Sequence, residues 1–255
     1  MSKISLKTPK EIALIAQGGK KLQRILQGLV KLTKAGISLE EIEDQAWREI
    51  GKTGGKPAFA QVPGYQWATC ININQGIVHG IPNQYRIKNG DIVTIDSGLL
   101  YRGWNTDMST TFQVAEGKLV PASEVEKFLV AGRKALKESI AQAYSGQRFG
   151  HISQTMQKVI EKAGYAPIRN LTGHGIGRKL HEPPLIPCFL SGDLKSTPLI
   201  KTGMVFAIEV IYAMGSSETE TDRGDNWTIR TKDGKIAAVF EKTIAIGDDG
   251  HLICT

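Results

Sequence analysis

The chain has 255 residues, 41% hydrophobic and 22% charged, which is the composition of a folded globular protein and excludes wholesale disorder. No apolar stretch reaches the roughly 18–20 residues that a membrane-spanning helix requires, and the first residues lack the apolar core of a secretory signal. The formal net charge of +7 is compatible with nucleic-acid binding, but no block of five like charges occurs, so we interpret the excess as surface lysines and arginines.

Two pairs of helices are predicted, one in each half of the chain. In the first half, a helix over residues 9–34 follows Thr8, a capping residue placed before a proline. A second helix, over residues 39–51, follows Ser38, which forms a capping box with the glutamate three residues on.

The second half repeats this pattern. Helices are predicted from about Ser123 to residue 144, and over residues 149–163. Laying Gly36 on Gly146 aligns the two helix pairs. We interpret the match as a weak internal duplication.

Segments rich in β-branched and aromatic residues follow each helix pair, at residues 91–100, 204–214 and 235–246. Asp233-Gly234 and Asp249-Gly250 predict hairpin turns near the end of the chain. These segments predict strands of an antiparallel sheet.

No low-complexity linker separates the two halves, about residues 1–120 and 121–255. We therefore expect one α+β domain over residues 1–255, with helices on one side of an antiparallel sheet.

Three cysteines, Cys70, Cys188 and Cys254, form no CxxC pair. Their odd number and wide spacing argue against a disulfide framework and against a cysteine zinc site. The sequence therefore predicts a protein of a reducing compartment, the cytoplasm.

Four acidic residues interrupt apolar strand segments, where an unpaired carboxylate is costly and calls for a cation. They are Asp96, Asp107, Glu209 and Glu241. A hairpin centred on the intervening turn would make Asp96 and Asp107 direct cross-strand partners, with Cβ atoms roughly 4.5–5.5 Å apart. Like charges so placed favour a site for two metal ions, which lie about 3.5–4 Å apart in such centres.

Three of the five histidines lie in unusual sequence surroundings. His79 is followed by Gly-Ile-Pro, His174 lies between two glycines, and His181 is followed by Glu-Pro-Pro. Glycines on both sides of His174 leave its imidazole accessible and let another backbone approach closely. One histidine with four carboxylates is a ligand set suited to Mn, Fe, Co or Zn. His151 and His251 have no such surroundings, and we interpret both as structural.

Other catalytic patterns fit less well. The glycines of residues 173–177 lack the Gly-Lys-Ser/Thr ending of a phosphate loop, and no Gly-x-Ser-x-Gly elbow of a serine hydrolase occurs. A glycosidase would use two of the acids but would leave the other ligand-type residues unexplained.

These residues resemble those of the methionine aminopeptidases, within the M24-like metallopeptidases of pita-bread fold. The matching stretches are CININQGIVHGIP, DIVTIDSGLLYRGWNTDMSTTF, GHGIGRKLHEPP, GMVFAIEV and AAVFEKT. The similarity covers about residues 8–255. The short interval of 35 residues between His174 and Glu209 is similar to that of the bacterial type I form.

The resemblance implies an α+β pita-bread fold with halves related by a pseudo-two-fold axis, and the activity of a methionyl aminopeptidase, a hydrolase. Such an enzyme removes the initiator methionine of nascent proteins, preferentially when the second residue is small. It also implies two divalent ions (Co, Mn, Fe or Zn). The implied ligands are Asp107, His174, Glu209 and Glu241 for one ion and Asp96 for the other, with Asp107 and Glu241 bridging both.

Further roles follow from the same resemblance. His79 is expected to contact the peptide nitrogen at the scissile bond, His181 to stabilise the carbonyl oxygen, and Glu209 to relay a proton as general base. Tyr65, Cys70 and Trp227 are candidates for the methionine pocket by motif position, with ordinary core packing as the alternative.

The sequence departs from the family pattern at four positions, Gln66, Leu180, Val210 and Lys242, where the family usually has other residues. None of these departures removes a ligand, but they bear on pocket shape and on selectivity for methionine. The alternatives are an X-Pro peptidase of the same fold and a non-catalytic pita-bread protein that binds peptides or RNA. The expected partners are nascent polypeptide N-termini, with transient ribosome association through the positive surface; a monomer without membrane contact is expected.

Overall fold

The structure is a computed structural model that describes residues 4–115 and 123–255. The boundary between halves expected near residue 120 lies outside these residues. The helices are α1 (Pro9–Leu32), α2 (Leu39–Lys52), α3 (Glu124–Ile140) and α4 (Phe149–Lys162), with short 3₁₀ turns at Phe59–Gln61 and Leu194–Ser196. Within the described residues, no helix is both long and apolar enough to cross a lipid bilayer.

The expected helix starts are confirmed. Thr8 and Ser38 each accept a hydrogen bond from the backbone N–H three residues on, and the glutamates there bond back to complete two capping boxes. Ser123 likewise accepts from the N–H of Glu126. The third helix ends at Ile140, four residues earlier than predicted, because tight turns take over at Ala141.

Most of the strands belong to two larger antiparallel sheets. The first contains β1 (Lys56–Pro57), β2 (Thr69–Ile73), β4 (Ile92–Tyr101) and β5 (Trp104–Gln113). The second contains β6 (Ala166–Pro167), β7 (Thr172–Gly175), β8 (Glu182–Pro187), β9 (Val205–Ala213), β12 (Ala237–Gly247) and β13 (Gly250–Ile253). A small third sheet contains β3 (Gly76–Val78), β10 (Thr219–Thr221) and β11 (Ile229–Thr231).

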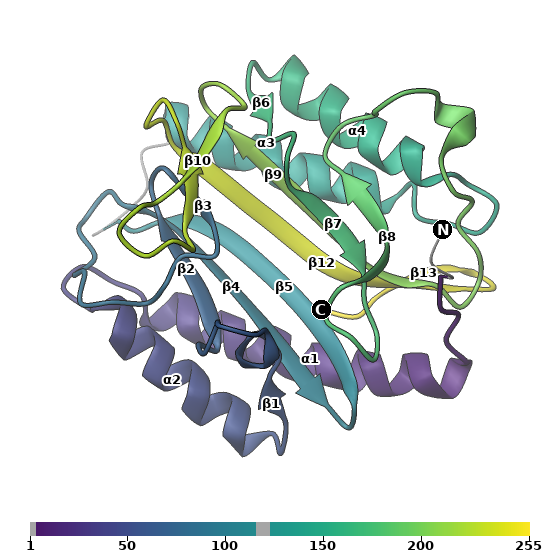
Figure 1. The fold of residues 1–255 in the computed structure, drawn as a ribbon, viewed down its shortest axis with the longest axis horizontal. Coiled ribbons are helices and arrows are strands. Elements are labelled where there is room, and N and C mark those ends of the chain that lie inside the picture. Colours follow the sequence, from purple (N-terminus) through teal and green to yellow (C-terminus); the bar gives the residue numbers. More distant parts are fainter. Residues whose placement is uncertain (1–3, 116–122) are drawn as a thin grey trace.

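The two halves repeat one arrangement, which confirms the predicted pseudo-two-fold relation. Strand β4 pairs with β1, β2 and β5, and β9 pairs in the same way with β6, β7 and β12. The helix pairs correspond too, since α1 packs on β4 and β5 while α3 packs on β9 and β12. In Figure 1, α1 and α3 pass behind the strands, so the helices cover one face of the sheets, as expected for this α+β fold.

The two larger sheets meet where β5 runs beside β12 (Figure 1). Threonine side chains join the two strands. Thr111 Oγ1 donates to the carbonyl of Val239 and accepts from its N–H, at 2.8 and 2.9 Å. Thr243 Oγ1 does the same for Asp107, at 2.8 and 3.0 Å. The seam is therefore fixed by two equivalent hydroxyl bridges, one of which holds the backbone of an expected metal ligand.

The predicted register of the β4–β5 hairpin is wrong by two residues, since Asp96 lies opposite Ser109 and not opposite Asp107. Asp107 pairs with Gly98 and Asp96 pairs with Ser109, so the two aspartates are diagonal neighbours on one face rather than direct partners. The cause is a two-residue turn at Arg102 and Gly103, which both have positive φ (52° and 79°), as a type I′ turn requires.

The two other predicted hairpin turns have different outcomes. The second predicted hairpin does join β12 to β13, but its turn residues are Asp248 and Asp249, and Gly250 already begins β13, paired with Gly247. The turn at Asp233-Gly234 makes no hairpin between consecutive strands, because β11 pairs with β10 and β3 whereas β12 pairs with β9 and β13.

Candidate active site

All ten residues that the sequence singled out as ligands, catalytic groups or pocket residues line one cavity of about 350 Å³. They come from both halves of the chain: Tyr65, Cys70, His79, Asp96, Asp107, His174, His181, Glu209, Trp227 and Glu241. The cavity is thus built where the two halves meet.

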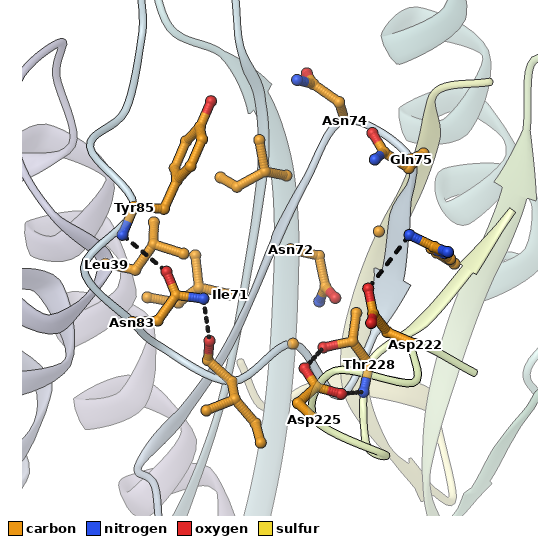
Figure 2. A pocket seen from close by; sticks show the side chains of 15 residues that line it. Leu39, Ile71, Asn72, Asn74, Gln75, Asn83, Tyr85, Asp222, Asp225 and Thr228 are labelled. Carbon is orange, nitrogen blue, oxygen red and sulfur yellow. Dashed lines mark hydrogen bonds and ion pairs between the residues drawn. The ribbon is translucent and has the colours of Figure 1, made fainter. Parts of the chain in front are cut away.

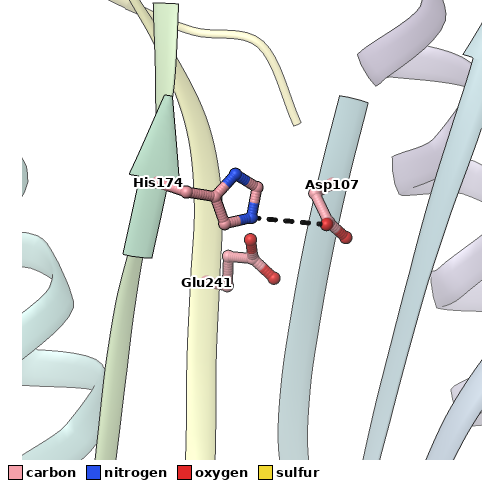
Figure 3. Close-up of side chains that lie close together, drawn as sticks. All are labelled: Asp107, His174 and Glu241. Atoms are coloured by element: carbon pink, nitrogen blue, oxygen red, sulfur yellow. Dashed lines mark ion pairs between the residues drawn. The ribbon is translucent and has the colours of Figure 1, made fainter. Parts of the chain in front are cut away.

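The tightest group of potential ligands is Asp107 on β5, His174 on β7 and Glu241 on β12 (Figure 3). One ligand atom of each lies within 4.8 Å of the others, and all three residues are buried. His174 Nε2 lies 3.9 Å from Asp107 Oδ2 and 3.5 Å from Glu209 Oε1. These side chains converge from separate strands on one point.

The backbone fixes the tautomer of His174. Its Nδ1 lies 2.9 Å from the carbonyl oxygen of Gly175, which only accepts, so Nδ1 carries the proton and Nε2 presents a lone pair to the carboxylates. Burial lowers the pKa of this imidazole to about 4. His174 is therefore neutral near pH 7, the form that binds a metal ion.

Close backbone packing explains the glycines beside His174. A Cβ on Gly173 would lie 2.5 Å from the carbonyl oxygen of Ala207 on the neighbouring strand. A Cβ on Gly175 would lie 2.2 Å from the carbonyl oxygen of Pro183. The expected close approach of another backbone is therefore present on both sides of His174.

The carboxylates repel one another, and among the described residues none of them forms an ion pair with a lysine or arginine. Burial, followed by the neighbouring charge of Asp107, raises the pKa of Glu209 and of Glu241 well above the ordinary value. Burial also raises the pKa of Asp107 to about 7 and that of Asp96 well above 3.8. One oxygen of Asp96 and one of Glu241 are buried without a hydrogen-bond partner. A cluster of orphaned carboxylates beside a neutral imidazole fits a divalent metal centre.

Two further histidines border the cavity. The ring of His181 packs edge-on against that of His174, with centroids 4.4 Å apart. His79 adopts φ = 61°, a left-handed conformation that a residue other than glycine rarely keeps without a structural reason. Burial lowers the pKa of His79, so this imidazole is neutral near pH 7.

One wall of the cavity is apolar. Tyr65 and Cys70 are buried, and the Tyr65 ring meets that of Trp227 at 5.2 Å. The Tyr65 hydroxyl donates to the backbone carbonyls of Thr69 and Gly80, which turns its apolar ring toward the cavity. Burial raises the pKa of the Cys70 thiol well above its usual value, so the thiol packs as an apolar group.

Comparison with known proteins decides the family. Residues 13–248 match the model of metallopeptidase family M24. The chain belongs to metallopeptidase family M24. A methionine aminopeptidase of Aquifex aeolicus is 38% identical over 259 residues, which cover 99% of this chain and 98% of that protein. Methionine aminopeptidase 1 of Bacillus subtilis is 36% identical, with 99% of each chain covered.

Solved structures agree. The crystal structure of a methionine aminopeptidase from Thermotoga maritima matches this M24 chain with a TM-score of 0.93 at 33% identity, and 99% of each chain is covered. The pita-bread expectation is therefore confirmed, and M24 membership makes the chain a hydrolase of the divalent-metal type.

The four departures from the usual M24 pattern lie at different depths. Leu180 lines the cavity, so it shapes the site directly. Val210 is buried and alternates with Glu209 along β9, whereas Gln66 is exposed. Lys242 is half-buried, with its Nζ 3.5 Å from the sulfur of Met108. Among the four, only Leu180 borders the cavity.

Several lining residues of this M24 site were missed from the sequence. They are Phe59, Val62, Val78, Asn170, Leu171, Thr172, Leu185 and Ile211. All eight are uncharged, and the sequence alone does not distinguish such a residue in a cavity wall from one in the hydrophobic core. Among these residues only Leu185 stands out, because its large apolar side chain on β8 is 69% exposed; that exposure is seen only once the strand is known.

A second cavity, of about 370 Å³, is lined by Asn72, Asp222 and Asp225 among other residues (Figure 2). It adjoins the first cavity, since His79 lines the first and Gly80 lines the second. Its carboxylates are already bonded: Asp222 Oδ2 lies 3.3 Å from Arg230, and Asp225 accepts from Thr228. It therefore lacks the free ligands of the first cavity, and we place the candidate active site in the first.

Proposed function

We propose that this protein is a metal-dependent methionine aminopeptidase that removes the initiator methionine of nascent proteins, preferentially when the second residue is small. One observation carries the proposal: five ligand-type side chains gather in a cavity whose other wall is apolar. The first feature suits metal-assisted hydrolysis, and the second suits a methionine side chain. The proposal treats residues 1–255 as a single catalytic domain.

Two divalent ions, of Mn, Fe, Co or Zn, are proposed. Asp107, His174, Glu209 and Glu241 would hold one ion, and Asp96 would hold the other with Asp107 and Glu241 shared. When bound, the ions lower the pKa of a water molecule toward neutrality and polarise the scissile carbonyl. The neutral His174 and the unpaired carboxylates favour this assignment.

The protein residues supply the other parts of the reaction. Glu209, with its raised pKa, would accept the proton of the attacking water and return it to the leaving amine. His181 would donate a hydrogen bond to the carbonyl oxygen as negative charge develops there. His79 would contact the peptide nitrogen at the scissile bond and orient it.

The substrate's methionine side chain would lie against Tyr65, Cys70 and Trp227. Burial of an unbranched thioether against aromatic rings is favourable, and sulfur also interacts well with ring edges. Because Leu180 joins this wall, it would set the width of the pocket and so the strictness of methionine selection.

The proposed setting is the cytoplasm, as a monomer acting on nascent N-termini and associating transiently with ribosomes. All three cysteines are free, which agrees with a reducing compartment. An electrostatic ribosome contact would weaken as salt is raised.

The test is to strip the purified protein with a chelator and to measure methionine release from Met-Ala-Ser after adding back Mn, Fe, Co or Zn. Asp107→Ala serves as the control. Metal-restored release that the variant lacks is the expected result. Cleavage of X-Pro peptides instead would assign the X-Pro activity, and metal binding without cleavage of either peptide class would assign a binding protein.

A further inference from the structure

The turn that carries His181 is tied to the N-terminal segment by a buried ion pair. Lys7 Nζ lies 2.8 Å from Glu182 Oε2, although the residues are 175 positions apart in the chain. Their side chains are only 2% and 11% exposed. Since Glu182 directly follows His181, this contact acts one residue away from the imidazole.

The ion pair lies directly on the backbone of the turn. The second carboxylate oxygen of Glu182 accepts from the N–H of Lys179 at 3.1 Å. A Cβ on Gly177 would lie 2.6 Å from Lys7 Cε and 2.7 Å from Glu182 Oε1. The last glycine of the GHGIG stretch is therefore needed to let the ion pair cross the turn.

Lys7 is itself held in place, so it can act as a fixed anchor. Its backbone N–H donates to the carbonyl of Gly203 at 2.7 Å, and the next residue, Thr8, caps α1. Its ammonium also lies 3.4 Å from the carbonyl oxygen of Ser5. A buried lysine or glutamate without its partner is strongly destabilising, so each of Lys7 and Glu182 fixes the other.

The imidazole of His181 needs such a support. The residue is exposed, and the described part of the chain offers its ring no hydrogen bond, only the edge-on packing against His174. The ring position therefore depends on the backbone of the turn. That backbone is held by Glu182, which does not line the cavity.

We propose that the Lys7–Glu182 ion pair is a positioning device that holds His181 in its place beside the metal-ligand cluster. Lys7 and Glu182 do not touch the substrate; they act through the turn of residues 177–182. The importance of this for turnover rests on the proposed function, whereas the effect on the His181 ring does not.

The first test needs no activity. The ring resonance of His181 is followed by ¹H–¹³C NMR in the metal-free protein, and His181→Ala provides its assignment. Lys7→Met is expected to shift or broaden this resonance and to speed amide exchange in residues 177–182 by about tenfold or more. Lys127→Met, which breaks the exposed ion pair with Glu124 on α3, is the matched control and should leave both unchanged.

Two more variants keep this test decisive. If Lys7→Met does not fold, Glu182→Gln removes the charge pair while keeping an oxygen that can accept from Lys179, and it should give the same NMR change. Lys7→Arg keeps the charge and should restore the wild-type resonance. An unchanged His181 resonance in folded Lys7→Met or Glu182→Gln would overturn the proposal.

The second test separates positioning from general damage. Lys7→Met should lower kcat for Met-Ala-Ser by about tenfold, since small misplacements of a reacting group are costly, with KM changed less than twofold. In a His181→Ala background the same substitution should cost no further activity. Equal losses in both backgrounds would overturn the positioning role. Absence of methionine release by the metal-loaded wild type would refute the proposed function, while the NMR result would still decide the positioning.

Discussion

Glu209 on β9 and Glu241 on β12 lie directly opposite each other in the antiparallel ladder. Like charges in that relation destabilise a sheet, and here both are drawn into a buried site. The sequence suggested that Asp96 and Asp107 would be direct cross-strand partners, but they are only diagonal neighbours. The two glutamates are the carboxylates that lie directly opposite each other. The pairing of β9 with β12 therefore creates the need for a cation at this site.

Glu241→Gln should stabilise the metal-free protein. Removing one of two opposed carboxylates relieves repulsion, so the melting temperature in chelator at pH 8 should rise by about 2–4 °C, equivalent to about 1 kcal/mol for a chain of this size. The same variant should lose metal affinity by calorimetry. The control is Glu43→Gln, because Glu43 is buried but accepts from the N–H groups of Ala68 and Thr69. If both variants lower the melting temperature, repulsion is not the controlling effect.

The pH dependence of metal-free stability follows from the pKa shifts. Burial raises the pKa of Asp107 from 3.8 to about 7, so its stabilising contribution is complete below about pH 4 and is lost as the pH rises to about 7. His174 acts oppositely: its pKa falls from 6.5 to about 4, so stability is lost as the pH falls through that window. The raised carboxylate pKa values of Asp96, Glu209 and Glu241 add to the first trend and should dominate.

Asp107→Asn isolates this effect from the rest of the protein. In chelator, the melting temperature of the variant minus that of the wild type should grow between pH 5 and pH 7.5. With saturating metal the wild type should gain stability over the same range, because the ligands bind in their deprotonated forms. A difference in chelator that shrinks with pH would contradict the assignment.

Interactions between residues close in the chain could be predicted from the sequence, whereas contacts between distant residues could not. The caps at Thr8 and Ser38 were predictable because donor and acceptor stand three residues apart. The acidic residues of the cavity were predictable because a charge in an apolar strand is conspicuous. The hairpin register was not, since Tyr101-Arg102-Gly103 admits two turn centres and only the backbone shows that Arg102 takes positive φ. The Lys7–Glu182 contact joins residues 175 positions apart in the chain, and no local pattern marks it.

The threonine bridge to Asp107 should control metal affinity. Thr243→Val leaves the N–H and carbonyl of Asp107 without partners, which costs roughly 1–3 kcal/mol for each buried group and frees the ligand to move. Thr111→Val breaks the equivalent bridge to Val239, together with a hydrogen bond to the Thr94 hydroxyl, and is the control for stability. Chemical denaturation should show a loss of stability for Thr111→Val at least as large as that for Thr243→Val, whereas metal titration should show the larger loss of affinity for Thr243→Val. Equal affinities would mean that the bridge only joins the sheets.

The turn before Trp227 should control recognition of methionine. Asp225 accepts hydrogen bonds from the N–H groups of Trp227 and Thr228, at 2.8 and 2.9 Å, so one carboxylate shapes the chain that presents the indole. Asp225→Ala should therefore loosen Trp227 and raise KM for Met-Ala-Ser by about tenfold, the scale on which an apolar pocket contact contributes, with kcat nearly unchanged. Asp225→Asn keeps one acceptor oxygen and should recover most of the affinity. A fall in kcat at constant KM would place Asp225 in support of the metal site instead, because a loosened pocket wall weakens binding without touching the reacting bond.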